Sequence, residues 1–146
     1  MSEAREFKVV GTRVIRPDGV DKVTGRANFG ADFTLPGMLY GKILRSPHAH
    51  ARIKRIDTTA AAAIEGVYAV ATGADFPKVG HEEITGGEGG GDFADLACNV
   101  MARDKVLYHG HAVAAVAAVS STIADAALAA IRVEYDVLKP VMDLDT

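Results

Sequence analysis

The chain has 146 residues, a formal net charge of −3 and a pI near 5.9, and 49% of its residues are hydrophobic. This size and composition are those of one globular domain and exclude a wholly disordered chain. The acidic balance predicts no nucleic-acid partner, because phosphate binding needs a basic face.

One cysteine, Cys98, excludes an internal disulfide and favours a reducing compartment. Residues 1–8 are charged and lack the apolar run of a signal peptide. The longest apolar run, Ala112–Val119, is too short to cross a bilayer. We therefore expect a cytoplasmic protein without a membrane partner.

The first part of the chain is predicted to be irregular. Residues 1–12 are expected to form an N-terminal lead-in, and residues 13–146 a single domain. A short strand is expected over Ala27–Asp32. Proline and glycine predict turns at Arg16–Gly19, Thr24–Gly25 and Leu35–Met38.

The middle of the chain alternates between strand and helix patterns. Residues Ala49–Lys54 place alanine and isoleucine on one face and basic or histidine side chains on the other, which predicts a half-buried strand. A helix is expected over Thr59–Glu65, capped by Asp57–Thr58 and ended by Gly66. Further strands are expected at Leu39–Arg45 and Val67–Thr72.

Residues 78–95 are predicted to form a long surface loop, because they are rich in glycine and acidic residues and lack a periodic apolar pattern. Glycine loses the most conformational entropy on ordering, so residues 80–93 are expected to be the least ordered part. The run Gly86–Gly91 is not interpreted as a phosphate cradle, since its flanks are acidic and no lysine follows it.

The last third carries the clearest pattern, a strand, a helix and a second strand. Ala112–Val119 is apolar at every position, which predicts a strand buried on both faces. Thr122 and Asp125 resemble a capping box that opens a helix to about Ile131. Apolar residues alternate over Ile131–Val137, which predicts a half-buried strand. We expect an α+β fold: a mixed sheet with two short-to-medium helices.

The histidines are the first candidates for chemistry, because they include two His-x-His pairs, His48/His50 and His109/His111. Residues i and i+2 of a strand share a face, so either pair offers two imidazoles to one metal. Pro47 and Gly110 interrupt the pairs, which favours the alternative of strand-end histidines that make hydrogen bonds. No metal ligand is assigned. The third ligand that a metal site would need is available in principle from Asp32, Asp57 and Asp104.

Two other features are weaker. Cys98 would need an electropositive setting to act as a nucleophile, and its neighbours do not provide one, so a buried or half-buried thiol is expected. A local basic cluster is interpreted as a solvated strand face or a docking face for an acidic partner, with anion binding as the alternative. The cluster consists of Arg45, Arg52, Lys54 and Arg55.

Several stretches, in this order along about residues 10–144, carry a resemblance to one family. They are Asp21–Ala27, Asp32–Tyr40, Leu44–Ile53 with Ile56–Asp57, Glu65–Val70, Thr72–Asp75, Leu96–Ala97, Asp104–Val106, Tyr108–Val119, Asp125–Leu128, Ile131–Tyr135 and Pro140–Asp143. On this ordered set the chain resembles the α/β-hammerhead domain of the molybdopterin-binding large subunit in the xanthine dehydrogenase/aldehyde oxidase family. The residue sequence of Leu39–Pro47 is most similar to the 4-hydroxybenzoyl-CoA reductase and carbon monoxide dehydrogenase large-subunit type.

The resemblance implies an α/β-hammerhead fold within a molybdenum hydroxylase-type oxidoreductase. In that family the complete subunit binds molybdopterin and works with iron–sulfur and flavin partners. Its catalytic and cofactor-binding residues lie in the domains that follow the hammerhead, so none is assigned to this chain. We expect a structural domain or split subunit that partners those molybdopterin-binding domains or subunits. The alternative is a stand-alone binding or assembly module that reuses the fold.

Self-association or binding to a partner is also expected, through an apolar face in the early part of the chain that a homodimer would cover. The turns there cannot bury all of the large side chains around them, and monomers rarely leave a wide apolar patch uncovered. The residues concerned are Phe29, Phe33, Leu35, Met38 and Leu39.

Overall fold

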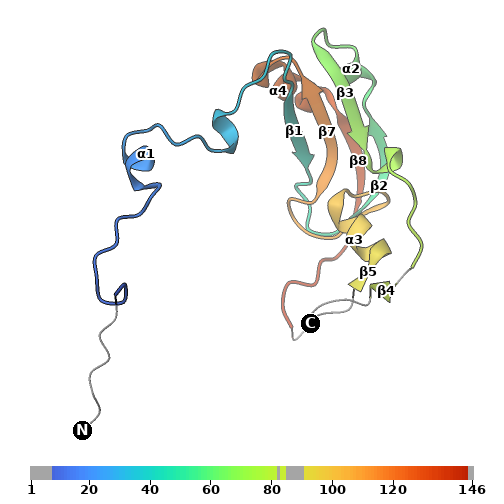
Figure 1. Cartoon of the computed structure of the whole chain (residues 1–146). Helices are drawn as coiled ribbons and strands as arrows, with labels where there is room; N and C mark the ends of the chain where they lie inside the picture. The colour runs from blue at the N-terminus through green and yellow to red at the C-terminus, as the bar shows by residue number, and fades with distance from the viewer. Residues whose placement is uncertain (1–7, 82, 85–90, 145–146) are drawn as a thin grey trace. The chain divides into compact units, whose positions relative to one another are not determined.

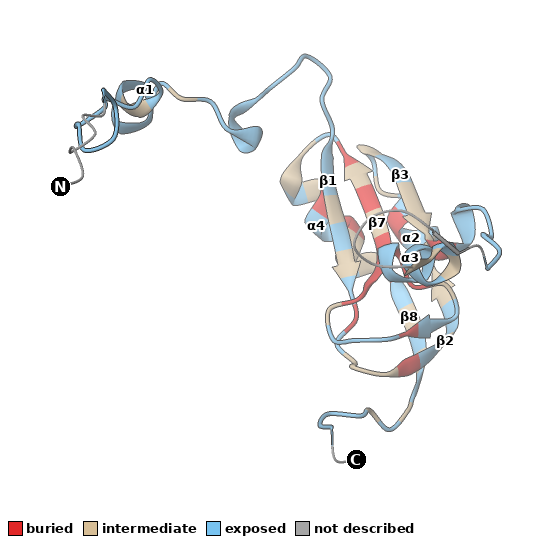
Figure 2. Cartoon of the chain, turned by 60° about the horizontal axis from the view of Figure 1, so that its bottom comes forward, coloured by how far each residue is buried: buried red, intermediate tan, exposed pale blue. Residues whose placement is uncertain are grey.

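The computed structural model describes residues 8–81, 83–84 and 91–144. The chain divides into two compact units, Met1–Pro36 and Gly37–Thr146. All of the buried residues in the described ranges belong to the second unit, as the burial colouring shows (Figure 2).

In its described residues, 8–36, the first unit contains one short helix, α1 (Gly19–Val23), and one 3₁₀ turn, η1 (Gly30–Asp32). The turn stands where a strand was expected over Ala27–Asp32, and that expectation is wrong. The Asp32 side chain accepts a hydrogen bond from the Phe29 amide at 2.9 Å, and the Asp32 amide donates back to the Phe29 carbonyl at 2.9 Å. This reciprocal pair closes a turn and removes the extended backbone that a strand requires.

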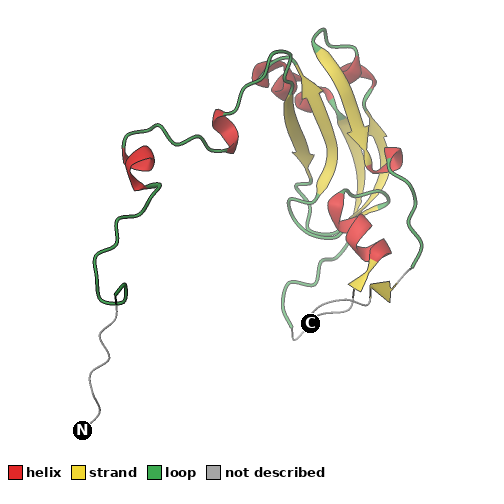
Figure 3. Cartoon of the chain, viewed as in Figure 1, coloured by secondary structure: helices red, strands yellow, loops and turns green. Residues whose placement is uncertain are grey.

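Two three-stranded sheets form the framework of the described part of the second unit (Figures 1 and 3). One has the order β1-β7-β3, the other the order β6-β2-β8, and β4 pairs with β5 in a separate two-stranded ribbon. All of these pairings between described strands are antiparallel. The strands are β1 (Tyr40–Arg45), β2 (Ala51–Asp57), β3 (Val67–Thr72), β4 (Glu83–Ile84), β5 (Gly91–Asp92), β6 (Lys105–Val106), β7 (Ala112–Ala118) and β8 (Arg132–Val137).

The α+β class expected from the sequence is confirmed, and the strands expected in the second unit form. The sheets differ from the expected mixed sheet, because β7 and β8 enter different sheets. A strand–helix–strand unit produces a parallel pair only when both strands join one sheet. Here the helix between them carries the chain from one sheet to the other.

That connecting helix is α4 (Ser121–Ala130), and its N-cap lies two residues earlier than expected. The hydroxyl of Ser120 accepts a hydrogen bond from the Ile123 amide at 3.2 Å, so Ser120 is the N-cap, and the capping box at Thr122 is wrong. Asp125 instead holds the Lys42 ammonium group of β1 at 2.6 Å.

Helix α2 (Thr59–Ala62) is shorter than expected. Capping by Asp57 is confirmed, since its carboxylate accepts from the Thr59 amide at 3.0 Å, whereas the Thr58 side chain makes no capping hydrogen bond. The hydrogen bond from the Thr59 amide is the main reason why the pKa of Asp57 lies below its ordinary value. Gly66, with φ at +87°, turns the chain from the helix region into β3.

The main core lies between the β1-β7-β3 sheet and helices α2 and α4. It consists of Ala61, Ala114, Val116, Ala118, Ala124, Ala127 and Ile131. A smaller core of Ala51, Ala102, Val106 and Val113 lies on the opposite face of β7. Ala115 and Ala117 on that same face are only half-buried. The expected burial of β7 on both faces therefore holds at Val113 but not along the whole strand.

Part of the loop expected over residues 78–95 is regular structure. It contains β4, β5 and the first turn of helix α3 (Phe93–Val100). The Asp92 carboxylate accepts from the Ala94 amide at 2.7 Å and so caps α3, and His81 contacts the same carboxylate at 2.7 Å. Residues 82 and 85–90, where least order was expected and where most of the Gly86–Gly91 run falls, lie outside the described residues.

Candidate functional site

His111, directly before β7, is a fully buried histidine. Its Nδ1 accepts a hydrogen bond from the Leu107 amide at 3.2 Å, so the ring proton is on Nε2, which donates to the Cys98 carbonyl of α3 at 2.8 Å. The Tyr108 ring stacks on the imidazole with 4.4 Å between ring centroids. Both ring nitrogens are used within the domain, so His111 fixes α3 to the turn before β7 and offers no nitrogen to a metal.

The other histidines lie in separate surroundings. The ring of His48 meets the Tyr135 ring edge-on, with centroids 4.9 Å apart, whereas His50 donates through Nδ1 to the Lys139 carbonyl at 3.0 Å. His109 is exposed. The hydrogen-bonding role expected of strand-end histidines is seen at His50 and His111. Within the described ranges, no three His, Cys, Asp or Glu residues lie close enough together to hold a metal ion.

The basic residues grouped in the sequence do not form one cluster. Arg45 belongs to β1 and donates to the Gly110 carbonyl at 2.9 Å, whereas Arg55 of β2 pairs with Asp57 at 3.1 Å. Arg52 and Lys54 are exposed on β2. The interpretation as a solvated strand face therefore suits these last two residues. Lys54 also lines a polar surface cleft with Arg55 and Arg103.

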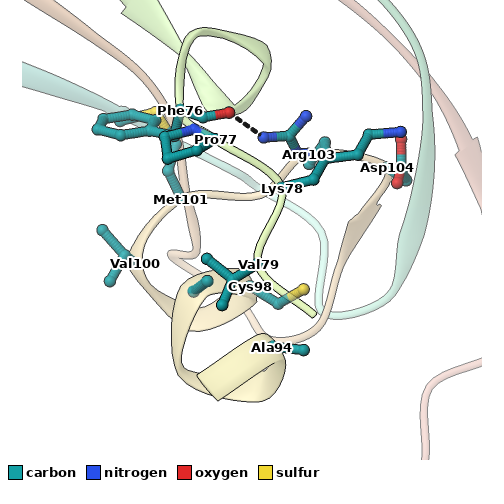
Figure 4. Close-up of a pocket in the computed structure, with 12 residues that line it drawn as sticks. Phe76, Pro77, Lys78, Val79, Ala94, Cys98, Val100, Met101, Arg103 and Asp104 are labelled. Carbon is teal, nitrogen blue, oxygen red and sulfur yellow. Dashed lines mark hydrogen bonds between the residues drawn. The ribbon is translucent and has the colours of Figure 1, made fainter. Parts of the chain in front are cut away.

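One candidate site is a cleft of about 360 Å³ between α3 and the segment after the 3₁₀ turn η2 (Gly73–Asp75) (Figure 4). Arg103 donates to the Phe76 carbonyl and joins the two walls at one end. Cys98 lines the cleft and is exposed, so the expected buried or half-buried thiol is wrong. The walls are mainly apolar, and their apolar members are Phe76, Pro77, Val79, Ala94, Ala97, Val100 and Met101.

Sequence reasoning missed this cleft because it missed α3. The signal that was available is Asp92, a good N-cap residue, followed by an acidic residue, Asp95, in the first turn. The glycine-rich run before Asp92 obscured that signal. Phe76 and Arg103 are far apart in sequence, and nothing in their local patterns indicates that they meet.

The buried state of His111 predicts a loss of stability in mild acid. Burial lowers the pKa of the His111 imidazole, and its hydrogen bonds to the Cys98 and Asn99 carbonyls oppose this less strongly. In the unfolded chain a histidine has a pKa of about 6.5. Because the folded chain binds this proton less tightly, the stability that neutral His111 contributes is fully present above that pH and is lost as the pH falls below it. Protonation would also place a donor at Nδ1 against the Leu107 amide.

Thermal unfolding of the wild type and His111→Gln between pH 7 and pH 5 measures this effect. We expect His111→Gln to be less stable at pH 7 but to lose less Tm than the wild type on acidification. His109→Gln, at an exposed histidine, serves as the control and should keep the wild-type slope. Equal slopes for all three proteins would contradict the expectation.

The fold described above defines a small α+β domain with two antiparallel sheets. The family model described as "Aldehyde oxidase and xanthine dehydrogenase, a/b hammerhead domain" matches residues 24–139. The chain therefore belongs to the hammerhead domain family of aldehyde oxidase and xanthine dehydrogenase.

Named relatives agree with this assignment. The chain is 45% identical over 129 residues to a probable xanthine dehydrogenase subunit of Bacillus subtilis, covering 88% of this chain and 16% of that protein. It is 34% identical over 141 residues to the nicotinate dehydrogenase large molybdopterin subunit of Eubacterium barkeri, covering 97% of this chain and 31% of that protein. The crystal structure of the Cu,Mo-CO dehydrogenase superposes with a TM-score of 0.73 at 34% identity, covering 91% of this chain and 16% of that one. The chain thus spans less than a third of the length of these relatives.

Molybdopterin, which the family implies, does not fit the residues that the structure describes. In that part of the chain, every buried side-chain nitrogen or oxygen already has a hydrogen-bond partner, which leaves no buried donor free for a pterin or its phosphate. The cleft beside α3 is mainly apolar, and Arg103 at its end is bound to the Phe76 carbonyl.

No described helix is long and apolar enough to cross a membrane.

Proposed function

We propose that this chain is the hammerhead part of a molybdenum hydroxylase large subunit and that its role there is structural. The catalytic and cofactor-binding groups would lie in other parts of the complete enzyme. The observation that supports a structural role is that several polar side chains form hydrogen bonds to the backbone of the same domain. His111, His50 and Arg45 all bond backbone carbonyls of this same domain. Side chains engaged in this way hold loops and strands in place.

The proposal extends to the type of enzyme and its setting. The residue sequence of Leu39–Pro47 supports a 4-hydroxybenzoyl-CoA reductase-like enzyme. The single cysteine of the chain supports a location in the reducing cytoplasm. The proposed partners are the molybdopterin-binding domains or subunits, with iron–sulfur and flavin subunits beyond them. The names of the relatives, which are subunits of dehydrogenases, support such an assembly.

A homodimer is proposed as a second mode of association. The five side chains expected to form its face are all exposed by a third or more, from 37% at Leu39 to 72% at Leu35. Three of them belong to the first unit and two to the second. Sedimentation of the pure chain at micromolar concentration tests this, and a clean monomer would contradict it.

The proposed function is tested by purifying the tagged chain from its own cells and by producing it alone. From its own cells we expect it to be recovered with molybdenum, with a fluorescent pterin derivative after oxidation, and with peptides of a xanthine dehydrogenase-family large subunit. Produced alone, it should be colourless and inactive. Molybdenum bound by the lone chain would contradict the structural role, and recovery without a pterin would instead support the stand-alone module.

A further inference from the structure

Helix α3 is apolar around most of its circumference. Only Asp95 and Asn99, four residues apart and therefore on one stripe, interrupt the apolar sequence between its cap and Val100. A helix with so wide an apolar surface is normally buried. None of the residues of α3 is buried, and its large side chains are exposed by 44% at Phe93, 50% at Leu96 and 66% at Val100.

The helix is nevertheless fixed in place, through its backbone. His111 donates to the Cys98 carbonyl at 2.8 Å, and the Tyr108 hydroxyl donates to the Asn99 carbonyl at 3.2 Å. At the other end, Asp92 caps the first turn. These bonds satisfy the helix ends while they leave the side chains free to meet another surface. The apolar face is thus preorganised, which lowers the entropic cost of binding.

The cleft beside α3 adds the second element of an interface. Its apolar walls and its volume of about 360 Å³ suit one or two large side chains of a partner. Interfaces concentrate their binding energy where such anchors enter apolar pockets. Cys98 lines this cleft, so its thiol reports directly on whether the cleft is filled (Figure 4).

The length of the relatives points to one occupant of this surface. The chain covers only 16% of the Bacillus subtilis relative, so there the same fold adjoins a much longer polypeptide that has surface available to cover such a face. We infer that α3 and its cleft are the docking surface for the molybdopterin-binding part of the large subunit, whether that part is joined to this chain or separate. This inference rests on the proposed function and assigns the surface through which it operates.

The first test measures alkylation of Cys98 by N-ethylmaleimide, followed by mass spectrometry of its peptide. Cys98 is the chain's one cysteine, so the isolated chain gives a single site. We expect rapid labelling of the isolated chain and labelling slowed by about tenfold or more in the assembled molybdenum enzyme, since access controls thiol reactivity. Protection in the isolated chain would overturn the inference, because the cleft would then be covered already.

The second test compares Val100→Glu with Val137→Glu. Both valines are exposed to a similar degree, 66% and 60%, but Val137 ends β8. Both variants should keep the wild-type melting temperature as isolated chains. We expect Val100→Glu to lower recovery of the molybdopterin-containing complex by about tenfold or more, because an unpaired carboxylate in an apolar interface is costly. Val137→Glu should leave recovery unchanged.

The outcomes separate this inference from the proposed function. Failure of the wild-type chain to recover any molybdopterin-containing partner would contradict the proposed function itself. Recovery by the wild type and Val100→Glu alike, with Cys98 still reactive in the complex, would leave the proposed function standing and overturn the docking surface. Concentration-dependent protection of Cys98 in the pure chain would assign the surface to a second copy and also overturn the inference.

Discussion

Replacing Val116 with aspartate is expected to abolish cooperative folding of the domain. Val116 is 2% exposed in the middle of β7 and belongs to the main core with Ala124 and Ala127 of α4. A carboxylate there would lose its hydration without gaining a hydrogen-bond partner. The cost is several kcal/mol, or about the whole stability of a domain of this size.

The cation nearest in register does not rescue the substitution. Lys42 lies opposite Val116 in the β1–β7 pairing, but its ammonium group is already held by Asp125 at 2.6 Å. Urea unfolding monitored by circular dichroism measures the effect. Val137→Asp, at a position that is 60% exposed, is the matched control and should unfold close to the wild type. A cooperative transition for Val116→Asp near that of the control would show that the assigned core is wrong.

The parts of the fold that were predictable are those in which local pattern and tertiary environment agree. The alternation of β2 and the continuous apolar run of β7 predicted their strands, because strand side chains alternate between faces whatever the neighbouring strand is. Strand β3 was predicted with its observed bounds, since Gly66 and Gly73 delimit it on either side.

What the sequence did not predict depends on contacts between distant segments. Ser120, Thr122 and Asp125 are all acceptable at a helix start. Ser120 is the N-cap, whereas Asp125 pairs with Lys42 of β1, a residue far away in the sequence. The separation into two sheets follows from which strands pair, and a strand's own pattern does not specify its partner.

The candidate site was the least predictable part. A His-x-His pattern places both imidazoles on the same face only on a regular strand. His109 and His111 lie in the turn before β7, where His109 is exposed and His111 is buried. The fully buried position of His111 depends on α3, which was hidden beside a glycine-rich run. The ordered motifs of the family resemblance predicted the fold, but they assigned no role to an individual side chain of this chain.

Gly73→Ala is expected to destabilise the domain by about 1–3 kcal/mol, as overpacking of a tight interior does. Gly73 is buried at the start of η2, and a Cβ there would lie 2.6 Å from the Ala102 carbonyl oxygen and 2.9 Å from the Arg103 Cα. These are backbone atoms, and the Ala102 amide is itself bonded to the Ala112 carbonyl at 2.8 Å, so the opposing segment cannot withdraw without breaking that bond.

Gly41→Ala is the matched control for this substitution, because a Cβ at Gly41 in β1 meets no atom within 4 Å. There the change should be neutral or stabilising by up to about 1 kcal/mol, since alanine restricts the unfolded chain more than glycine does. Urea unfolding of both variants gives the comparison. If Gly73→Ala proved as stable as Gly41→Ala, the close approach of η2 to the segment after α3 would be wrong, and with it the position of the wall that Gly73 and Arg103 contribute to the cleft.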